Sequence, residues 1–380
     1  MNPTILVVCG TRPDAIKMAP VILELRKHAD LGTRIVASGQ HREMLRQVLH
    51  AFNLTEDRNF DVMKERQSLA YLTSSILTAL DQLLEEERPD LVLAQGDTTT
   101  TFVAGLAAFY REIPFGHVEA GLRTDTIYSP FPEEFNRRAA SQVTRLHFAP
   151  THAAAQNLLA DRVSAESVFV TGNTSIDAIL EVTRRLGPSE PFAPGRMLLV
   201  TTHRRENWGE PQRRICRALM RVLDAVPDTH VVLPMHPNEA VRRTLRDELG
   251  GSDRVFLIEP QDYPSFARLM LASHLILTDS GGIQEEAPSL GKPVLVLRDE
   301  TERPEGVAEG NAILVGTDKE RIFTEAKRLL SDENPLPLAE VRDRKARNPY
   351  GDGKAAQRIV SHVRRFLGLE AEELPPFSHP

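Results

Sequence analysis

The chain has 380 residues, of which 41% are hydrophobic and 26% are charged, and its formal net charge is -7. This mild acidity argues against nucleic acid as a main partner, because binding a phosphate backbone requires a basic field. The two cysteines, Cys9 and Cys216, have no CxxC partners, which argues against a disulfide framework and a zinc site.

The N-terminal stretch MNPTILVVCGTRP has no basic segment, and its apolar run is too short for a signal peptide. No run of about 20 apolar residues occurs, so we expect no membrane span. These features predict a cytoplasmic protein.

Short apolar, β-branched runs alternate along the chain with segments of helical period. We expect strands at 4–10, 33–39, 90–97, 113–121, 196–203, 229–236, 254–259, 275–282, 292–299 and 312–316. We expect helices at 15–27, 67–87, 174–186 and 211–226. Such alternation predicts parallel, doubly wound α/β sheets whose strands are buried on both faces.

The alternation pauses between about 172 and 195, where GPSEPFAPG is the stretch richest in Pro and Gly. We place a domain boundary there, with one domain at 1–172 and a second at 173–352. The segment 351–369 has an amphipathic helical pattern, and we expect the final EELPPFSHP to be frayed.

Charged and polar residues follow nearly every expected strand, in both halves of the chain. The motifs are GTRPDAIK, SGQHRE, QGDTTT, HVEAGLRT, THRRENWG, MHPN, DSGG and RDETERPEG. Ligands of open parallel sheets bind at the carboxyl ends of the strands. The distribution therefore favours a binding cleft between two α/β domains.

Two expected helix starts suit an anion. Arg12 and Lys17 flank a proline that fits a first helical turn, although a capped helix with solvated basic residues is an equal alternative. In TDSGGIQEEA, Ser280 could cap the helix and two glycines would let a phosphate approach. The two glutamates that follow fall in the expected first turn, where they suit the helix dipole but would repel a phosphate.

Three acidic positions are candidates for proton transfer. Asp97 precedes a threonine run and could instead be an N-cap. Glu119 directly follows an apolar strand, where a purely structural role for a carboxylate is less expected. Glu133 and its neighbour at 134 begin a proline-fixed helix, and the arginines at 137–138 could simply pair with them.

His203 and His236 each follow an expected strand, although a lone histidine is more often structural. No Ser-His-Asp order, Walker motif, HExxH or GxGxxG fingerprint occurs. The residues thus predict a two-domain α/β protein with a carboxylate-rich, phosphate-binding cleft. A nucleotide-linked substrate and proton-transfer or group-transfer chemistry fit that description.

A set of motifs in fixed order resembles the non-hydrolysing UDP-N-acetylglucosamine 2-epimerases from about residue 4 to residue 365. The motifs are GTRPDAIKMAP, SGQHREML, QGDTTTTF, HVEAGLRT, FPEEFNRR, HRREN and TDSGGIQEEAPSLGKPVLVLRDETERPEG. Asp14 stands where that family usually has Glu, which keeps the charge.

The resemblance implies two Rossmann-like domains facing a central cleft (glycosyltransferase-B architecture), with the helix at about 353–369 packed back onto the first domain. It also implies reversible conversion of UDP-N-acetylglucosamine to UDP-N-acetylmannosamine in a homodimer that needs neither NAD nor metal. The product would supply cell-surface polysaccharide synthesis; capsule, teichoic-acid linkage and common-antigen pathways all stay open.

The implied mechanism removes the C2 proton while UDP leaves C1, and UDP then adds back to a 2-acetamidoglucal. The implied acid/base groups are Asp97, Glu119 and Glu133, with individual roles left open, and His203 would assist departure of the diphosphate.

The resemblance also implies a set of substrate contacts. These are Arg12, Lys17, Gln261, Phe266, Ser280, Gly281, Gly282, Glu286 and Arg303. Within this set, the serine and glycines would hold the diphosphate, Glu286 the ribose and Phe266 the uracil.

Some family members are activated by substrate at a second site. Gln40, Arg66, Glu133 and His236 match parts of that site, but Glu43 stands where activated members carry Gln. Substrate activation therefore stays open.

Three rival functions use the same fold. They are a glycosyltransferase, a hydrolysing relative that releases free sugar and UDP, and a catalytically silent nucleotide-sugar sensor. The density of ionisable groups favours the epimerase over the transferase and the sensor.

Overall fold

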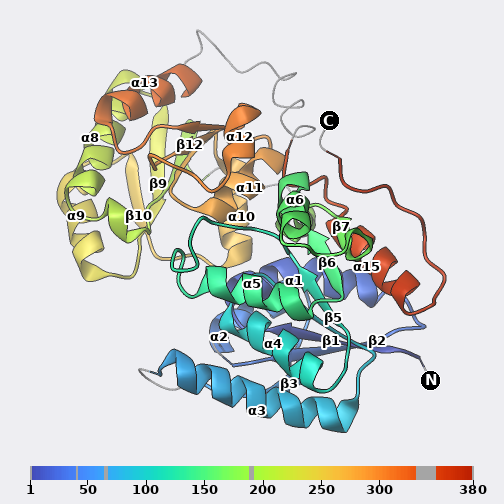
Figure 1. The fold of residues 1–380 in the computed structure, drawn as a ribbon. Helices are drawn as coiled ribbons and strands as arrows, with labels where there is room; N and C mark the ends of the chain where they lie inside the picture. The colour runs from blue at the N-terminus through green and yellow to red at the C-terminus, as the bar shows by residue number, and fades with distance from the viewer. Residues whose placement is uncertain (1, 40–41, 64–66, 188–191, 331–347, 379–380) are drawn as a thin grey trace. The chain divides into compact units, whose positions relative to one another are not determined.

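The computed structural model describes all residues except 1, 40–41, 64–66, 188–191, 331–347 and 379–380. The chain divides into two compact units, residues 1–178 with 350–378 and residues 179–349. Each unit contains one sheet of parallel strands flanked by helices, which confirms the expected α/β fold (Figure 1). The division falls within helix α7 (Thr174–Leu186), slightly after the boundary expected from the sequence.

The first unit contains a seven-stranded sheet in the order β3-β2-β1-β4-β5-β6-β7, and every pairing is parallel. The strands are β1 (Thr4–Cys9), β2 (Gly32–Ala37), β3 (Arg58–Asn59), β4 (Leu91–Gln95), β5 (Phe115–Val118), β6 (Leu146–Ala149) and β7 (Val168–Val170). The central strands are apolar runs without alternation, as expected of parallel strands covered on both faces.

Helices cover this sheet on both sides. They are α1 (Arg12–Leu25), α2 (Arg42–Ala51), α3 (Leu69–Glu87), α4 (Thr99–Tyr110), α5 (Glu133–Val143), α6 (His152–Ala160), η1 (Ala165–Ser167) and α15 (Ala355–Phe366). Leu6 and Val8 of β1 pack in one core cluster with α3 and α4. Successive strand residues point to opposite faces, so the equally buried Ile5 and Val7 face the other layer, where α1 contacts β1 and β4.

The second unit contains a six-stranded parallel sheet in the order β10-β9-β8-β11-β12-β13. The strands are β8 (Arg196–Thr201), β9 (Thr229–Pro234), β10 (Val255–Ile258), β11 (Leu275–Thr278), β12 (Val294–Val296) and β13 (Ala312–Leu314). The helices are η2 (Arg205–Asn207), α8 (Glu210–Ala225), α9 (Glu239–Leu249), α10 (Tyr263–Ala272), α11 (Gly281–Ser289), α12 (Pro304–Ala308) and α13 (Lys319–Leu330). Helices α8, α9 and α13 share one core cluster with this sheet, and Figure 1 shows them together on one of its faces.

The C-terminal segment packs against the first unit, where α15 lies on α1. The Phe377 N–H donates to the Val170 carbonyl of β7 at 2.9 Å, and its ring is buried. The Arg358 guanidinium lies 5.8 Å from the centre of that ring. The expectation of a frayed tail is therefore wrong for residues 372–378, because one aromatic side chain anchors them.

Every strand expected from the sequence forms, but β3, β6 and β7 were not predicted. Cys9 and Cys216 are free and buried. Within the described part of the chain, no helix is long and apolar enough to cross a membrane.

Candidate functional site

Glu119 lies at the carboxyl end of β5, where the backbone has a left-handed φ of 64°. Its buried carboxylate accepts hydrogen bonds from Lys17 Nζ at 2.6 and 2.8 Å and from Asn173 Nδ2 at 3.0 Å. Gln95 Nε2, at the end of β4, donates to the same carboxylate. A left-handed backbone at a non-glycine residue is strained and concentrates at functional sites, so this position is a strong candidate.

Lys17 reaches Glu119 from the second turn of α1. Thr11 is the N-cap of that helix, and a proline occupies its first turn, as the sequence predicted. The Asp14 carboxylate accepts the N–H groups of Gly10 and Thr11 at 3.1 and 3.0 Å. Burial raises the pKa of Asp14 to about 6, against the hydrogen bonds that lower it. These two N–H groups therefore bond a carboxylate of the chain itself, and half-buried Arg12 begins the helix beside them.

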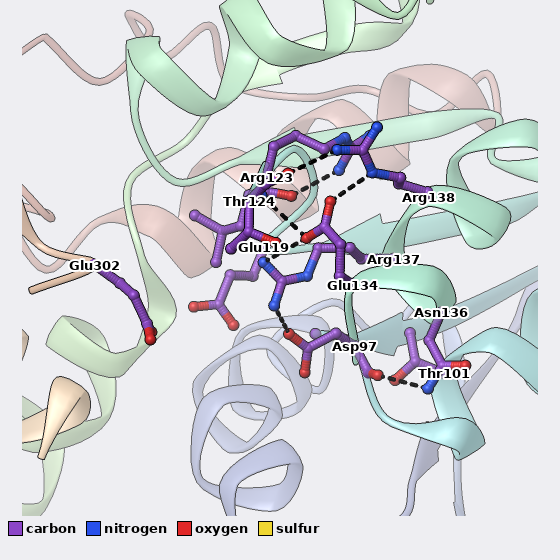
Figure 2. A network of polar contacts seen from close by, with 12 residues as sticks. Asp97, Thr101, Glu119, Arg123, Thr124, Glu134, Asn136, Arg137, Arg138 and Glu302 are labelled. Carbon is purple, nitrogen blue, oxygen red and sulfur yellow. Dashed lines mark hydrogen bonds and ion pairs between the residues drawn. The ribbon is translucent and has the colours of Figure 1, made fainter. Parts of the chain in front are cut away.

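Asp97 follows the neighbouring strand β4, and Arg137 Nη2 of α5 donates to its Oδ2 at 2.6 Å (Figure 2). Burial raises the pKa of Asp97; Arg137 opposes that rise, and the nearby Glu119 carboxylate adds to it. The N-cap of α4 is Thr98, which accepts the N–H of Thr101 at 3.3 Å. The interpretation of Asp97 as an N-cap is therefore wrong.

The two glutamates at the start of α5 have different surroundings. Glu134 is fully buried, and its carboxylate accepts from Arg138 Nε at 2.5 Å and from the Thr124 N–H at 3.2 Å. Arg137 Nη1 lies 3.4 Å from the same carboxylate, so Glu134 sits between both arginines (Figure 2). The ion-paired interpretation is confirmed for Glu134, whereas Glu133 is half-buried at the helix start.

The first unit thus brings Asp97 and Glu119 together at the ends of adjacent strands, each with its own cation. A Cβ placed on Gly96 would lie 3.9 Å from Glu119 Oε2, which shows how closely the two strand ends approach. Two neighbouring carboxylates with separate electrostatic environments can take different protonation states, as acid/base chemistry requires.

In the second unit, His203 follows β8 and Asp279 follows β11. His203 Nδ1 lies 2.6 Å from Asp279 Oδ1, and the imidazole is about half exposed. Burial opposes ionisation of Asp279, but hydrogen bonds from His203, Arg204 and Asn207 outweigh it and lower its pKa. The carboxylate fixes the ring and favours a proton on Nδ1.

Helix α11 begins at Gly281 with Ser280 as N-cap, although the serine side chain makes no capping hydrogen bond. No acidic side chain lies in its first turn, so the expected position of the two glutamates was wrong by one turn. Glu285 forms an ion pair with Arg303, and the Glu286 carboxylate accepts from Tyr263 Oη at 3.2 Å.

Three more predicted residues, Gln261, Phe266 and His236, lie in the second unit. Gln261 Nε2 donates to the Glu259 carbonyl at 2.7 Å, and Phe266 is half-buried on α10. The His236 Nδ1 accepts the Asn238 N–H at 3.1 Å. The predicted residues Gln40 and Arg66 lie outside the described part of the chain. Among the described residues, no group of three or more His, Cys, Asp or Glu could hold a metal ion.

A family model described as UDP-N-acetylglucosamine 2-epimerase matches residues 23–364. The chain belongs to this epimerase family. It is 50% identical over 378 residues to the UDP-N-acetylglucosamine 2-epimerase of Bacillus subtilis (strain 168), covering 98% of each chain. It is 48% identical to the enzyme of that name in Escherichia coli (strain K12), covering 95% of this chain and 98% of that one.

Among solved structures, the UDP-GlcNAc 2-epimerase of Neisseria meningitidis bound to UDP-GlcNAc superposes with a TM-score of 0.84 at 46% identity. The match covers 95% of this chain and all of that one. The expected family is therefore confirmed across nearly the whole length.

Several polar partners in this epimerase were not singled out from the sequence. Gln95, Asn173 and Asp279 each bond a candidate residue, but only the last carries a local signal. Arg137 was expected only as a partner of the glutamates that begin α5, and its bond to Asp97 was not expected. Asp279 directly follows an apolar strand and could have been chosen on the same grounds as Asp97, which comes one residue after its strand.

Proposed function

We propose that this chain interconverts UDP-N-acetylglucosamine and UDP-N-acetylmannosamine by inverting the configuration at C2. The observation that carries the proposal is the pair of carboxylates at adjoining strand ends, Glu119 held by Lys17 and Asp97 held by Arg137. Family membership supports the substrate, since the relatives are named for it. In the cell we assign the reaction to the cytoplasm and to the supply of cell-surface polysaccharide synthesis.

The proposed reaction is an elimination followed by an addition. A base takes the C2 proton, a C1–C2 double bond forms, and the C1–O bond breaks with UDP leaving as the anion. UDP then adds back to the 2-acetamidoglucal while a proton arrives at C2 from the opposite face. This route needs acid/base groups on both faces of the sugar, for which Asp97, Glu119 and Glu133 are the proposed set.

The surroundings of Asp97 suit such a role. Burial raises the pKa of its carboxyl above the usual value, and a higher pKa is the direction that helps a carboxyl both take and return a proton. The C2 proton is weakly acidic, so departure of UDP needs electrostatic assistance. We assign that assistance to His203, whose ring Asp279 holds in place.

We propose that the nucleotide-sugar binds through cations, a helix start and a few neutral groups. The proposed contacts are Arg12, Lys17, Gln261, Phe266, Ser280, Gly281, Gly282, Glu286 and Arg303. Lys17 and Arg303 already pair with carboxylates, so the ligand's phosphates would share or displace those partners. A regulatory role for His236, together with Gln40 and Arg66, remains a proposal from the family resemblance.

We also propose that the chain is a homodimer. Large apolar side chains are exposed on and just before helices α4 and α5, namely Phe109 at 59%, Tyr110 at 60% and Phe131 at 62%. Helices α4 and α5 pack against each other, and exposed large apolar side chains on such a face commonly mark protein interfaces. Sedimentation should give a dimer for the wild type and a monomer for Phe109→Glu, and an unchanged dimer would place the interface elsewhere.

Incubation with UDP-N-acetylglucosamine in D2O, followed by NMR, tests the reaction. We expect deuterium at C2 and accumulation of the manno epimer without added cofactor. Release of free sugar and UDP would instead indicate the hydrolysing reaction. Absence of exchange, with transfer of the sugar to an acceptor, would indicate a glycosyltransferase.

Two isosteric variants test the carboxylates separately. Asp97→Asn and Glu119→Gln should abolish deuterium exchange while leaving UDP binding largely intact, because each removes a proton acceptor and little volume. If either variant keeps turnover close to that of the wild type, that residue is not an acid/base group.

A further inference from the structure

Asn173 immediately precedes α7, and its buried side-chain amide makes two different hydrogen bonds. The amide oxygen accepts the Ser175 N–H at 3.0 Å, which caps the start of α7. The amide nitrogen donates to Glu119 Oε1 at 3.0 Å. One side chain therefore stabilises a helix start and holds a carboxylate of the candidate site.

This double use explains why the position suits asparagine. A helix cap needs a side-chain acceptor, which Asn, Asp, Ser and Thr all provide. An ionised carboxylate such as Glu119 accepts hydrogen bonds only, so its partner must be a donor. Aspartate has the shape of asparagine and caps as well, but it offers no donor.

Asn173 is itself fixed by a second segment of the chain. Its backbone N–H donates to the Tyr350 carbonyl at 2.6 Å, where the chain re-enters the first unit. One turn further along α7, the Asp177 carboxylate accepts the N–H groups of Ala355 and Ala356 at 3.2 and 2.9 Å. The first turn of α7 is therefore tied to the start of α15.

The donors to Glu119 differ in kind. Lys17 carries a charge on a flexible stem and is also a proposed substrate contact. Gln95 and Asn173 are neutral amides, and they come from a strand and from a tied helix start. Neutral donors orient a carboxylate and favour its ionised form without adding a competing charge. Neither amide is a proposed substrate contact, so both would stay on the carboxylate if Lys17 moved to a ligand.

We propose that Asn173 is a positioning residue for Glu119, acting through the hydrogen bond from its side-chain amide. The inference rests on the proposed epimerase function for its effect on turnover, but the bond itself can be tested without turnover. The side-chain amide nitrogen of Asn173 sets the direction of the Glu119 carboxylate, while the other contacts of Asn173 hold the start of α7 in place.

Asn173→Asp separates the two uses of the side chain. It keeps the cap, so UDP binding should stay close to wild type, and thermal stability at neutral pH should fall only by the cost of placing two carboxylates side by side. It replaces the donor with a second negative charge beside Glu119, which disfavours ionisation of that carboxylate. We expect kcat to fall by about tenfold or more at neutral pH, KM to change little, and the acidic limb of the kcat profile to move up by about one pH unit.

Asn2→Asp is the matched control in the same unit. Asn2 is exposed, and its amide donates to the Ala29 carbonyl at 2.9 Å, so the variant also loses an amide donor and gains a charge. Its kcat and pH profile should match those of the wild type. Asn173→Ala should lower thermal stability as well as kcat, because it removes both the cap and the donor.

A titration of carboxyl signals in protein labelled with 13C at glutamate gives a readout besides activity, with Glu119→Gln identifying the signal. The signal should titrate at higher pH in Asn173→Asp than in the wild type. If it titrates at the same pH, the positioning role is refuted, whether or not the wild type is active. If the wild type shows no C2 exchange but the signal moves, only the proposed function fails.

Discussion

Replacing Arg137 tests how the protein controls the charge of Asp97. The guanidinium donates to the carboxylate at 2.6 Å, and its side chain is only 11% exposed. Burial raises the pKa of Asp97, and the pairing with Arg137 works against that rise. Arg137→Gln removes the opposing cation, so the pKa of Asp97 should rise further.

The size of the rise follows from the geometry. An opposite charge at this distance lowers the pKa of a carboxyl by about 1–3 units. The Asp97 side chain is 30% exposed, so solvent screening favours the lower part of that range. We therefore expect a rise of about 1–2 units, or roughly 1.4–2.7 kcal/mol in favour of the protonated form.

The assay is the pH profile of kcat/KM for C2 exchange. If Asp97 acts as a base, activity needs the ionised form, and the acidic limb should move up by about 1–2 pH units. If Asp97 acts as an acid, the alkaline limb should move up instead. The matched control is Arg138→Gln, because Arg138 also pairs with Glu134 but makes no hydrogen bond to Asp97 among the contacts described. If Arg137→Gln leaves both the acidic and the alkaline limb of the pH profile unchanged, Arg137 does not control the charge of Asp97.

Three further predictions concern stability, measured as the midpoint of urea unfolding. Glu134→Gln removes the buried partner of Arg138 but keeps its volume, and should destabilise by about 2–3 kcal/mol; an unchanged midpoint would show that the pair contributes nothing. Phe377→Ala should cost about 2–4 kcal/mol if the tail is anchored as described, whereas exposed Ser378→Ala should cost nothing measurable. Burial raises the pKa of Asp177 to about 7, so the folded protein keeps a proton that the unfolded chain releases at about pH 3.9. The resulting stabilisation is complete below about pH 3.9 and disappears as the pH rises to about 7. Asp177→Asn should therefore make the free energy of unfolding less dependent on pH between these two values.

The sheets could be predicted because most of their strands are uninterrupted apolar runs buried on both faces. Residues 91–94, for example, read LVLA and are all fully buried in β4. β6 and β7 carried no such signal. The first is four residues long and includes His147, and the second is three residues long and only partly covered at the sheet edge. A pattern that short cannot be separated from a loop by periodicity.

The positions of Asp97 and Glu119 were predictable for a local reason, since each lies within two residues of the end of a parallel strand. Their partners were not predictable, because Arg137 and Asn173 come from elements 40 and 54 residues away along the chain. Nothing in the sequence around Asn173 indicates a carboxylate beside it. Pairings of this kind depend on how helices dock on the sheet, which local patterns do not encode.

At the start of α11, the structure places the residues of the TDSGGIQEEA motif differently from the sequence expectation. The motif suggested two glutamates in the first turn, where they would repel a phosphate. Ser280 is instead the N-cap and the two glycines begin the first turn, so both glutamates lie in the second. Glu285 then holds Arg303 so that a Cβ on Gly281 would lie 3.8 Å from the guanidinium. The carboxylate brings a cation to the start of the helix, where the first turn itself carries no acidic side chain. In the proposed function, Glu285 therefore favours binding of the diphosphate, because it holds the positively charged Arg303 at the start of the helix. The negative charge of Glu285, which the sequence suggested would repel a phosphate, is neutralised by Arg303.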